Sequence, residues 1–240
     1  MIHSSDRPQI GFDRFIQLDW AEAAFRMRAG ISNLQHLMDL VDASTPGAAA
    51  RKKTRTVLNR LWLEPKNDLV DFANRAVGIY LDALATPIAA LTWGMAITTY
   101  PFFASVAQIV GRLTALQGDC ASAEVHRRMA EVYGEREGTR RMTNMVPQSQ
   151  ASWGTIDRIG NGKRLERKVK IDIEASAAAS WLVEACLRYG GRPLSIASLD
   201  TNPVIYPFNL GSSLSYLLST VSTLDVRRYG TGNQVVSLKE

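Results

Sequence analysis

The chain has few residues of the kinds that bind metals or form disulfides. Its 240 residues include two cysteines and three histidines. Cys120 and Cys186 both lie in apolar helical patterns, which predicts buried, reduced thiols rather than a disulfide. His3, His36 and His126 are scattered along the chain, and none has a metal-binding spacing to a cysteine. We therefore expect no metal site.

Motifs of the common enzyme classes are missing as well. The sequence has no nucleophile elbow, no dinucleotide fingerprint and no pair of carboxylates beside a glycine-rich loop. Gly162-Lys163 resembles part of a phosphate-binding loop, but Arg164 stands where that loop needs Ser or Thr. We expect a non-enzymatic protein with no catalytic residue and no cofactor. A nuclease whose acidic residues lie far apart in the sequence is the alternative that motifs leave open.

Charge is absent from one long stretch, residues 83–110. The stretch is long enough to span a bilayer, but Pro87 and Pro101 interrupt it and Thr, Ser and Gln dilute it. This composition favours two buried core helices that meet near Pro101 over a membrane span. Residues 1–10 have no apolar segment of the kind that a secretory signal needs. We expect a cytoplasmic protein with no membrane partner.

Positive charge is concentrated in one window of the chain. Residues 122–170 contain eleven Lys or Arg and six Asp or Glu, a net charge of +5. The whole chain also has a net charge of +5, so everything outside this window sums to zero. A basic patch within a small helical unit is typical of proteins that bind nucleic acids.

Hydrophobic periodicity predicts a mainly α fold in three regions. Residues 1–99 form a helical N-terminal region, residues 100–174 a winged helix-turn-helix module, and residues 175–240 a second, winged-helix-like module. Each module ends in a small β-hairpin wing. The order of three helices followed by a hairpin within about seventy residues is that of a winged helix.

The first module is the more clearly marked, between residues 102 and 172. Its first helix ends at Gly118, a natural C-terminal capping residue, and its hairpin turns at Gly160-Asn161-Gly162, where positive φ angles are tolerated. Its third helix runs from about Glu137 or Thr139 toward Trp153-Gly154, unless Pro147, which either kinks the helix or ends it near Val146, cuts it short. We expect the following side chains of the first two helices to face inward: Val106, Ile109, Val110, Leu113, Leu116, Val125, Met129 and Val132.

The second module differs in charge. Its middle helix is weakly marked because of Pro203 and Pro207, and Ser212 or Ser213 is expected to cap its last helix. Its hairpin is expected to turn at residues 230–233. No charged residue occurs between residues 201 and 224, and Arg227 and Arg228 are the only obvious contacts for an anion. We read this module first as a surface for partner proteins.

Three groups of residues are candidates for DNA contact. Polar side chains of the third helix can read base edges in the major groove, cations of the wing can bind phosphates or enter the minor groove, and two arginines of the second helix can reach the backbone. For each group the alternative is a solvated, charged face. The candidates are Thr139, Arg140, Arg141, Asn144 and Gln148; Arg158, Lys163, Arg164, Arg167 and Lys168; and Arg127 and Arg128.

Several short motifs give the chain a resemblance to a known group of proteins. They are Tyr100-Pro101-Phe102-Phe103, Ile109-Val110-Gly111-Arg112-Leu113, Gln117-Gly118, Tyr133-Gly134-Glu135-Arg136 and Trp153-Gly154. The layout from about residue 67 onward is similar to that of the BrxA-type proteins of bacterial BREX phage-defence systems. The resemblance implies a winged-helix DNA-binding accessory protein encoded in a defence or DNA-modification locus, and it assigns no individual site residue.

Together these patterns predict a non-enzymatic protein that binds double-stranded DNA. Other proteins of the same defence system are possible partners of the second module. Two alternatives stay open at this stage. One is a protein–protein scaffold that uses winged helices for docking without DNA, and the other is a dimeric transcriptional regulator.

Overall fold

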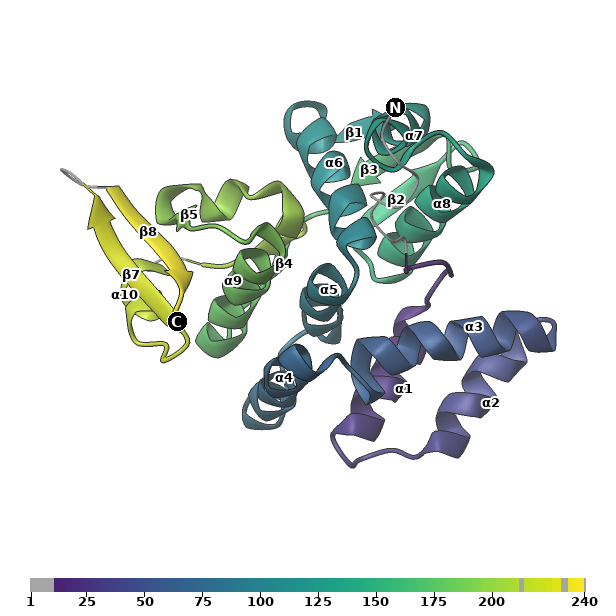
Figure 1. Ribbon diagram of the computed structural model, residues 1–240, viewed down its shortest axis with the longest axis horizontal. Helices are drawn as coiled ribbons and strands as arrows, with labels where there is room; N and C mark the ends of the chain where they lie inside the picture. The colour runs from purple at the N-terminus through teal and green to yellow at the C-terminus, as the bar shows by residue number, and fades with distance from the viewer. Residues whose placement is uncertain (1–10, 212–213, 230–232, 240) are drawn as a thin grey trace.

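The computed structural model describes residues 11–211, 214–229 and 233–239. Within these ranges the protein is mainly helical, with three small β-sheets in its second half (Figure 1). This agrees with the mainly α fold class that the sequence predicts. Among the described helices, none combines the length and the apolar character that crossing a membrane requires.

From Leu18 to Asp82 all regular secondary structure is helical. The inward faces of these helices bring together aromatic rings, such as those of Phe25 and Trp62, whose centroids lie 4.8 Å apart. Arg28 joins two of these helices, because its guanidinium donates to the carbonyl of Trp62 and to the side chain of Asn74. The elements are α1 (Leu18–Arg28), α2 (Leu34–Ser44), α3 (Ala48–Leu58), the π-helical turn η1 (Asn59–Leu63), the 3-10 turn η2 (Asn67–Leu69) and α4 (Val70–Asp82).

The uncharged stretch forms two core helices, as predicted. Helices α5 (Ile88–Thr99) and α6 (Pro101–Gln117) meet at Tyr100. Pro101 begins α6, where its missing N–H has no intrahelical partner to lose. Helix α5 is buried along nearly its whole length and contacts α1, η1, α6 and α9. Figure 1 shows α5 at the centre, between the N-terminal helices and the two units that follow.

Residues 101–167 form the basic unit. After α6 come β1 (Asp119–Ala121), α7 (Ser122–Tyr133), α8 (Glu137–Ser152) and a hairpin of β2 (Ile156–Ile159) and β3 (Arg164–Arg167). Strand β3 lies in the middle of an antiparallel sheet of order β1-β3-β2. In this register Leu165 pairs with Cys120 on one side and with Arg158 on the other.

Residues 176–238 form the C-terminal unit, whose elements follow a similar order, with 3-10 turns where the basic unit has α7. Its sheet, of order β5-β8-β7, again pairs the first strand with the last one. A short parallel pair, β4 (Ile171–Asp172) with β6 (Phe208–Asn209), joins the two units. The other elements are α9 (Ser176–Gly190), β5 (Leu194–Ser195), the 3-10 turns η3 (Ile196–Thr201) and η4 (Pro203–Ile205), α10 (Leu214–Ser219), β7 (Leu224–Tyr229) and β8 (Asn233–Leu238).

Some sequence-based predictions need correction, and others lie outside the described residues. Leu116 is 96% exposed because it lies in the last turn of α6, beyond the core. Val132 is also exposed, since Tyr133 continues the inward row of Val125 and Met129 at a spacing of four residues. The expected cap at Ser212 or Ser213 and the turn over 230–232 fall outside the described ranges. The division of the chain at 99/100 and 174/175 stays a prediction, because one hydrophobic core runs through all three regions.

The basic unit and the C-terminal unit approach most closely where α6 crosses η4. A Cβ atom on Gly111 of α6 would lie 2.1 Å from the carbonyl oxygen of Pro203. Next to this crossing, Trp93 Nε1 donates a hydrogen bond of 2.9 Å to the carbonyl of Val204. A glycine is therefore needed at position 111 for the two backbones to touch.

We predict that Gly111→Ala destabilises the protein. Alanine normally favours a helix interior by about 1 kcal/mol over glycine, but here the methyl group must displace backbone, and such overpacking costs roughly 1–3 kcal/mol. Gly78→Ala in α4 is the matched control, because nothing lies within 4 Å of its Cβ position. Denaturant unfolding should show a lower free energy of unfolding for Gly111→Ala and no decrease for Gly78→Ala. Equal stabilities of the two variants would contradict the close approach.

Candidate nucleic-acid interface

Helix α8 runs through Pro147 to Ser152, next to the predicted Trp153-Gly154, so the alternative that it ends near Val146 is wrong. Proline removes one hydrogen bond of the helix, and contacts from outside the helix hold the part of α8 beyond it. Ser149 Oγ accepts a hydrogen bond of 2.9 Å from the backbone N–H of Ile16, and Trp153 Nε1 donates one of 3.0 Å to the carbonyl of the same residue. The segment before α1 thus holds the second half of α8 in place.

The first half of α8 presents polar side chains to solvent. Arg140, Arg141 and Asn144 are all exposed, which is compatible with their predicted contact with DNA. Thr139 is only 2% exposed, so its prediction as a contact residue is wrong. Its position on the helix faces the core, four residues before the buried Thr143, to which its carbonyl is hydrogen-bonded. Gln148 is half-buried.

The hairpin between β2 and β3 has the tight turn that the sequence predicts. Its two central residues, Asn161 and Gly162, have φ angles of 56° and 80°, and the N–H of Lys163 donates to the carbonyl of Gly160 at 3.2 Å. Left-handed φ angles at both positions define the turn type that suits a two-residue hairpin loop. We call residues 160–163 the hairpin tip.

Arg158 fastens the hairpin tip to α8. Its guanidinium lies over Gly162, where a Cβ atom would be 2.4 Å from Nη2. The same Nη2 donates to Oδ1 of Asn144 at 3.3 Å. Arg158 is half-buried by these contacts. Its first effect is therefore to set the distance between hairpin and helix.

The other predicted cations of the hairpin are in different situations. Lys163 is exposed at the tip, and no ion pair is formed with it among the described residues. Arg164 forms an ion pair with Asp119 of β1. Lys168 lies 3.4 Å from a carboxylate oxygen of Asp157. Of these three cations, Lys163 is the one that has no carboxylate partner in the described part of the chain.

Arg167 points into the protein, so its prediction as a DNA contact is wrong. Its guanidinium donates to the carbonyl of Gly111 at 2.8 Å and to Oγ1 of Thr114 at 3.1 Å. It also lies 4.9 Å from the centroid of the Tyr206 ring. Because these partners belong to α6 and to the C-terminal unit, the half-buried Arg167 joins the two units.

The two arginines predicted on α7 are exposed but neutralised. Arg127 forms ion pairs with Glu124 and Glu131, and Arg128 with Glu124. Hydrogen bonds from both arginines lower the pKa of Glu124 to about 2. These pairs cancel the local charge, so α7 contributes less positive potential than the sequence alone suggests.

The uncompensated cations gather around hollows between α7, α8 and the hairpin tip. One hollow of about 310 Å³ is lined by His126, Glu137, Arg140, Arg141 and Asn144. A second hollow of about 520 Å³ reaches the tip, and we call it the basic hollow. Its lining residues are Ser122, Ala123, His126, Arg140, Asn161, Gly162 and Lys163.

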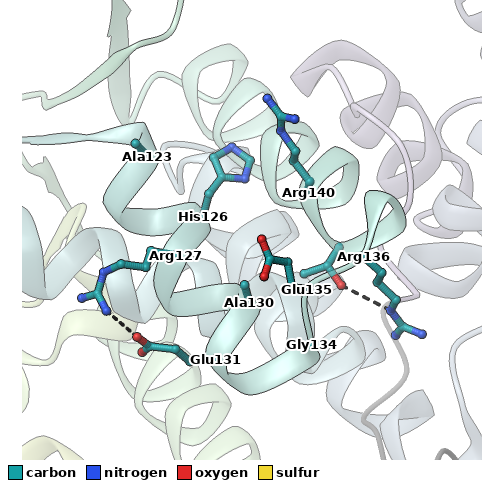
Figure 2. A pocket seen from close by; sticks show the side chains of 10 residues that line it. Ala123, His126, Arg127, Ala130, Glu131, Gly134, Glu135, Arg136 and Arg140 are labelled. Carbon is teal, nitrogen blue, oxygen red and sulfur yellow. Dashed lines mark hydrogen bonds and ion pairs between the residues drawn. The ribbon is translucent and has the colours of Figure 1, made fainter.

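Figure 2 shows a third hollow of about 590 Å³ that continues along α7. His126 and Arg140 stand on its α7 wall and its α8 wall, and the ion pair of Arg127 with Glu131 lies at its far side. Glu131 and Glu135 also line this hollow. Arg127 and Arg136 line it as well, so this hollow carries side chains of both charges.

His126 is the residue of this surface that the sequence did not reveal as a site. It lines all three hollows and its ring Nδ1 is buried with no hydrogen-bond partner among the described residues. Burial lowers the pKa of His126, and the positive charge of Arg140 lowers it further. The sequence offered one signal: His126 lies four residues after Ser122, so both share the face of α7 that meets the hairpin.

The structure adds two observations on other chemistry. Both cysteines are buried free thiols, as predicted, and burial raises the pKa of Cys120 to about 11. Within the described ranges no three His, Cys, Asp or Glu side chains are grouped so that they could hold a metal ion.

Protein-family models, curated proteins and solved structures provide no match to this chain.

Proposed function

We propose that this protein binds double-stranded DNA through the basic unit and catalyses no reaction. The observation that carries the proposal is the grouping of Arg140, Arg141 and Lys163 around adjoining hollows. None of the three has an ion-pair partner among the described residues, whereas Arg127, Arg128, Arg164 and Lys168 are paired with carboxylates. Cations that the protein leaves uncompensated on one face favour an anionic partner.

The order of elements in the basic unit supports a winged helix-turn-helix in which α8 is the recognition helix and β2–β3 the wing. In such a module the N-terminal half of the recognition helix meets the bases. Arg141 and Asn144 have the side chains that pair with guanine and adenine in the major groove. Arg140 and Lys163 flank the basic hollow, and we assign them to the phosphate backbone.

The C-terminal unit has a similar element order and a different surface, and we propose that it contacts other proteins. Two large aromatic side chains are exposed there, Tyr216 on α10 at 77% and Tyr229 on β7 at 61%. Exposed tyrosines are enriched in protein interfaces. Together with the resemblance to BrxA-type proteins, this supports a cytoplasmic accessory role in a bacterial antiviral defence or DNA-modification system.

The direct test is a salt titration of binding to a fluorescently labelled DNA duplex. The logarithm of affinity should fall linearly with the logarithm of salt concentration, because each phosphate contact releases counterions. A parent protein without measurable affinity for duplex DNA at low salt would overturn the proposal. Tight, salt-insensitive binding to a protein partner would then favour the scaffold alternative.

Lys163→Ala should lower the slope of that titration by about one, which corresponds to one lost phosphate contact. The matched control is Lys168→Ala, which removes the same charge from the other end of the hairpin, where Asp157 already neutralises it. We expect a smaller change of slope for the control. Equal slopes for both variants would show that the hairpin tip does not contact the backbone.

A further inference from the structure

We infer that the basic hollow is a binding site for a single backbone phosphate and that His126 binds this phosphate in its protonated, imidazolium form. The inference rests on the proposed DNA binding and names a further ligand of the same site. Its ligand class is a phosphodiester group, the repeating anion of the DNA backbone. Its residues are Arg140, Lys163 and His126, which come from α8, the hairpin tip and α7.

The geometry of the hollow suits an anion. Arg140 and Lys163 bring two positive charges to its rim, and neither is paired with a carboxylate in the described part of the chain. Gly162 at the tip has no side chain, and the position of its missing Cβ is occupied by the guanidinium of Arg158. A third positive group thus lies behind the wall of the hollow. No carboxylate is among the residues that line it.

His126 has a donor that the protein does not use. A neutral imidazole carries one N–H and an imidazolium carries two. Nδ1 is buried and has no partner among the described residues, so Nε2 is the ring nitrogen that can donate to a ligand in the hollow. The free protein gives this ring no carboxylate to pair with, and Arg140 repels its charged form. A phosphate oxygen in the hollow would reverse both effects, because it accepts a hydrogen bond and carries negative charge.

The charges that face His126 come from each element around it. Helix α8 contributes Arg140, Arg141 and Glu137, and the hairpin tip contributes Lys163. Helix α7 itself contributes Arg127 and Glu131, which pair with each other, and the loop between α7 and α8 contributes Glu135 and Arg136. The basic hollow and the hollow of about 310 Å³ together are lined by three cations, Arg140, Arg141 and Lys163, and by one carboxylate, Glu137. This environment disfavours an imidazolium until an anion binds.

Proton uptake on binding is the measurable consequence. In the free protein the pKa of His126 lies below its ordinary value of 6.5, because of burial and then of Arg140. A bound phosphate raises this pKa. Between the lower and the raised value, binding takes up one proton, so affinity falls as pH rises, by at most about tenfold per pH unit.

The experiment compares duplex binding of the parent and of His126→Asn from about pH 5.5 to about pH 7.5 at constant salt. Other titrating groups act equally on both proteins, so the ratio of the two affinities isolates His126. We expect the parent's advantage to shrink at least about threefold over this range. A constant ratio, with DNA binding intact in both proteins, would overturn the phosphate site and leave the proposed function standing. Absence of binding by the parent would overturn both.

A second measurement does not depend on affinity. Histidine ring resonances in NMR report each pKa separately, and His36, exposed on α2, provides the internal control. Addition of a short DNA duplex should raise the pKa of His126 by about one unit or more and change that of His36 by much less. Equal changes of the two pKa values would indicate general screening by DNA and contradict a specific site.

Discussion

Replacement of Arg140 and Arg141 together by alanine is expected to weaken duplex binding by about 30-fold. The base contact proposed for Arg141 contributes about 1–3 kcal/mol, the phosphate contact proposed for Arg140 adds to it, and about 2 kcal/mol corresponds to roughly 30-fold in the dissociation constant. The effect is large because both side chains are exposed on the first half of α8 and neither has a carboxylate partner in the described residues. Fluorescence anisotropy at low salt measures it directly.

The matched control is Lys52→Ala combined with Arg60→Ala. These residues are exposed at α3 and η1, outside the basic unit, and their replacement removes the same two positive charges. A purely non-specific attraction would fall equally in both double variants. If the variant with both α8 arginines replaced binds duplex DNA as tightly as the parent, α8 does not contact DNA.

Glu184→Gln is expected to reduce the free energy of unfolding by about 3 kcal/mol. The Glu184 side chain on α9 is 1% exposed and accepts hydrogen bonds from Arg75 of α4, from Arg188 and from Thr223. Breaking a buried ion pair by removal of one charge costs roughly 3–5 kcal/mol. We expect the lower end, because Arg75 and Arg188 keep 36% and 27% exposure and can partly return to water.

The decrease in the free energy of unfolding caused by Glu184→Gln should depend on pH. Burial raises the pKa of Glu184, but hydrogen bonds from Arg75, Thr223 and Arg188 and the charge of Arg75 outweigh it, so the net shift is downward. A carboxyl with a lowered pKa stabilises the fold above its unfolded pKa, near 4.3. This contribution disappears as pH falls through the folded value. Denaturant unfolding should therefore show a large difference between variant and parent at neutral pH and a smaller one in acid.

Glu22→Gln is the control for this prediction. Glu22 pairs with Arg26 one turn later on α1, and both side chains are partly exposed. Surface pairs of this kind contribute at most about 1 kcal/mol. Similar losses for Glu22→Gln and Glu184→Gln would argue against the special role of the buried network.

Local chemistry explains why parts of this structure could be predicted from the sequence. Positive φ angles at Asn161 and Gly162 are a property of the turn itself, so the hairpin was predictable from those two residues. The missing N–H of Pro101 and the left-handed cap at Gly118 likewise define where α6 begins and ends. The uncharged run could be identified as core because water would otherwise cover a large apolar surface.

The extent of α8 could not be predicted in the same way. Pro147 is a local signal for a break, and Ile16, more than 130 residues away in the sequence, holds the helix together beyond it. A hydrophobic pattern along the sequence cannot indicate a partner so far away.

The direction in which a polar side chain points also depends on residues that are distant in the sequence. Arg167 turns toward Tyr206, and Thr139 toward the core, because of segments that the chain brings up later.

The sequence by itself determined the mainly helical fold class, the hairpin turn, the buried thiols and the window that holds the net charge, because each depends on composition or on neighbours within one or two turns. The tertiary structure decided which cations of the hairpin and of α8 are available. It pairs Arg164 with Asp119 of β1, turns the half-buried Arg167 toward Gly111 and Thr114, and leaves Arg140, Arg141 and Lys163 around His126. The pairs of Arg127 and Arg128 are local, because their carboxylates lie within one turn of α7, but the contacts of Arg164 and Arg167 join residues that are distant in the sequence.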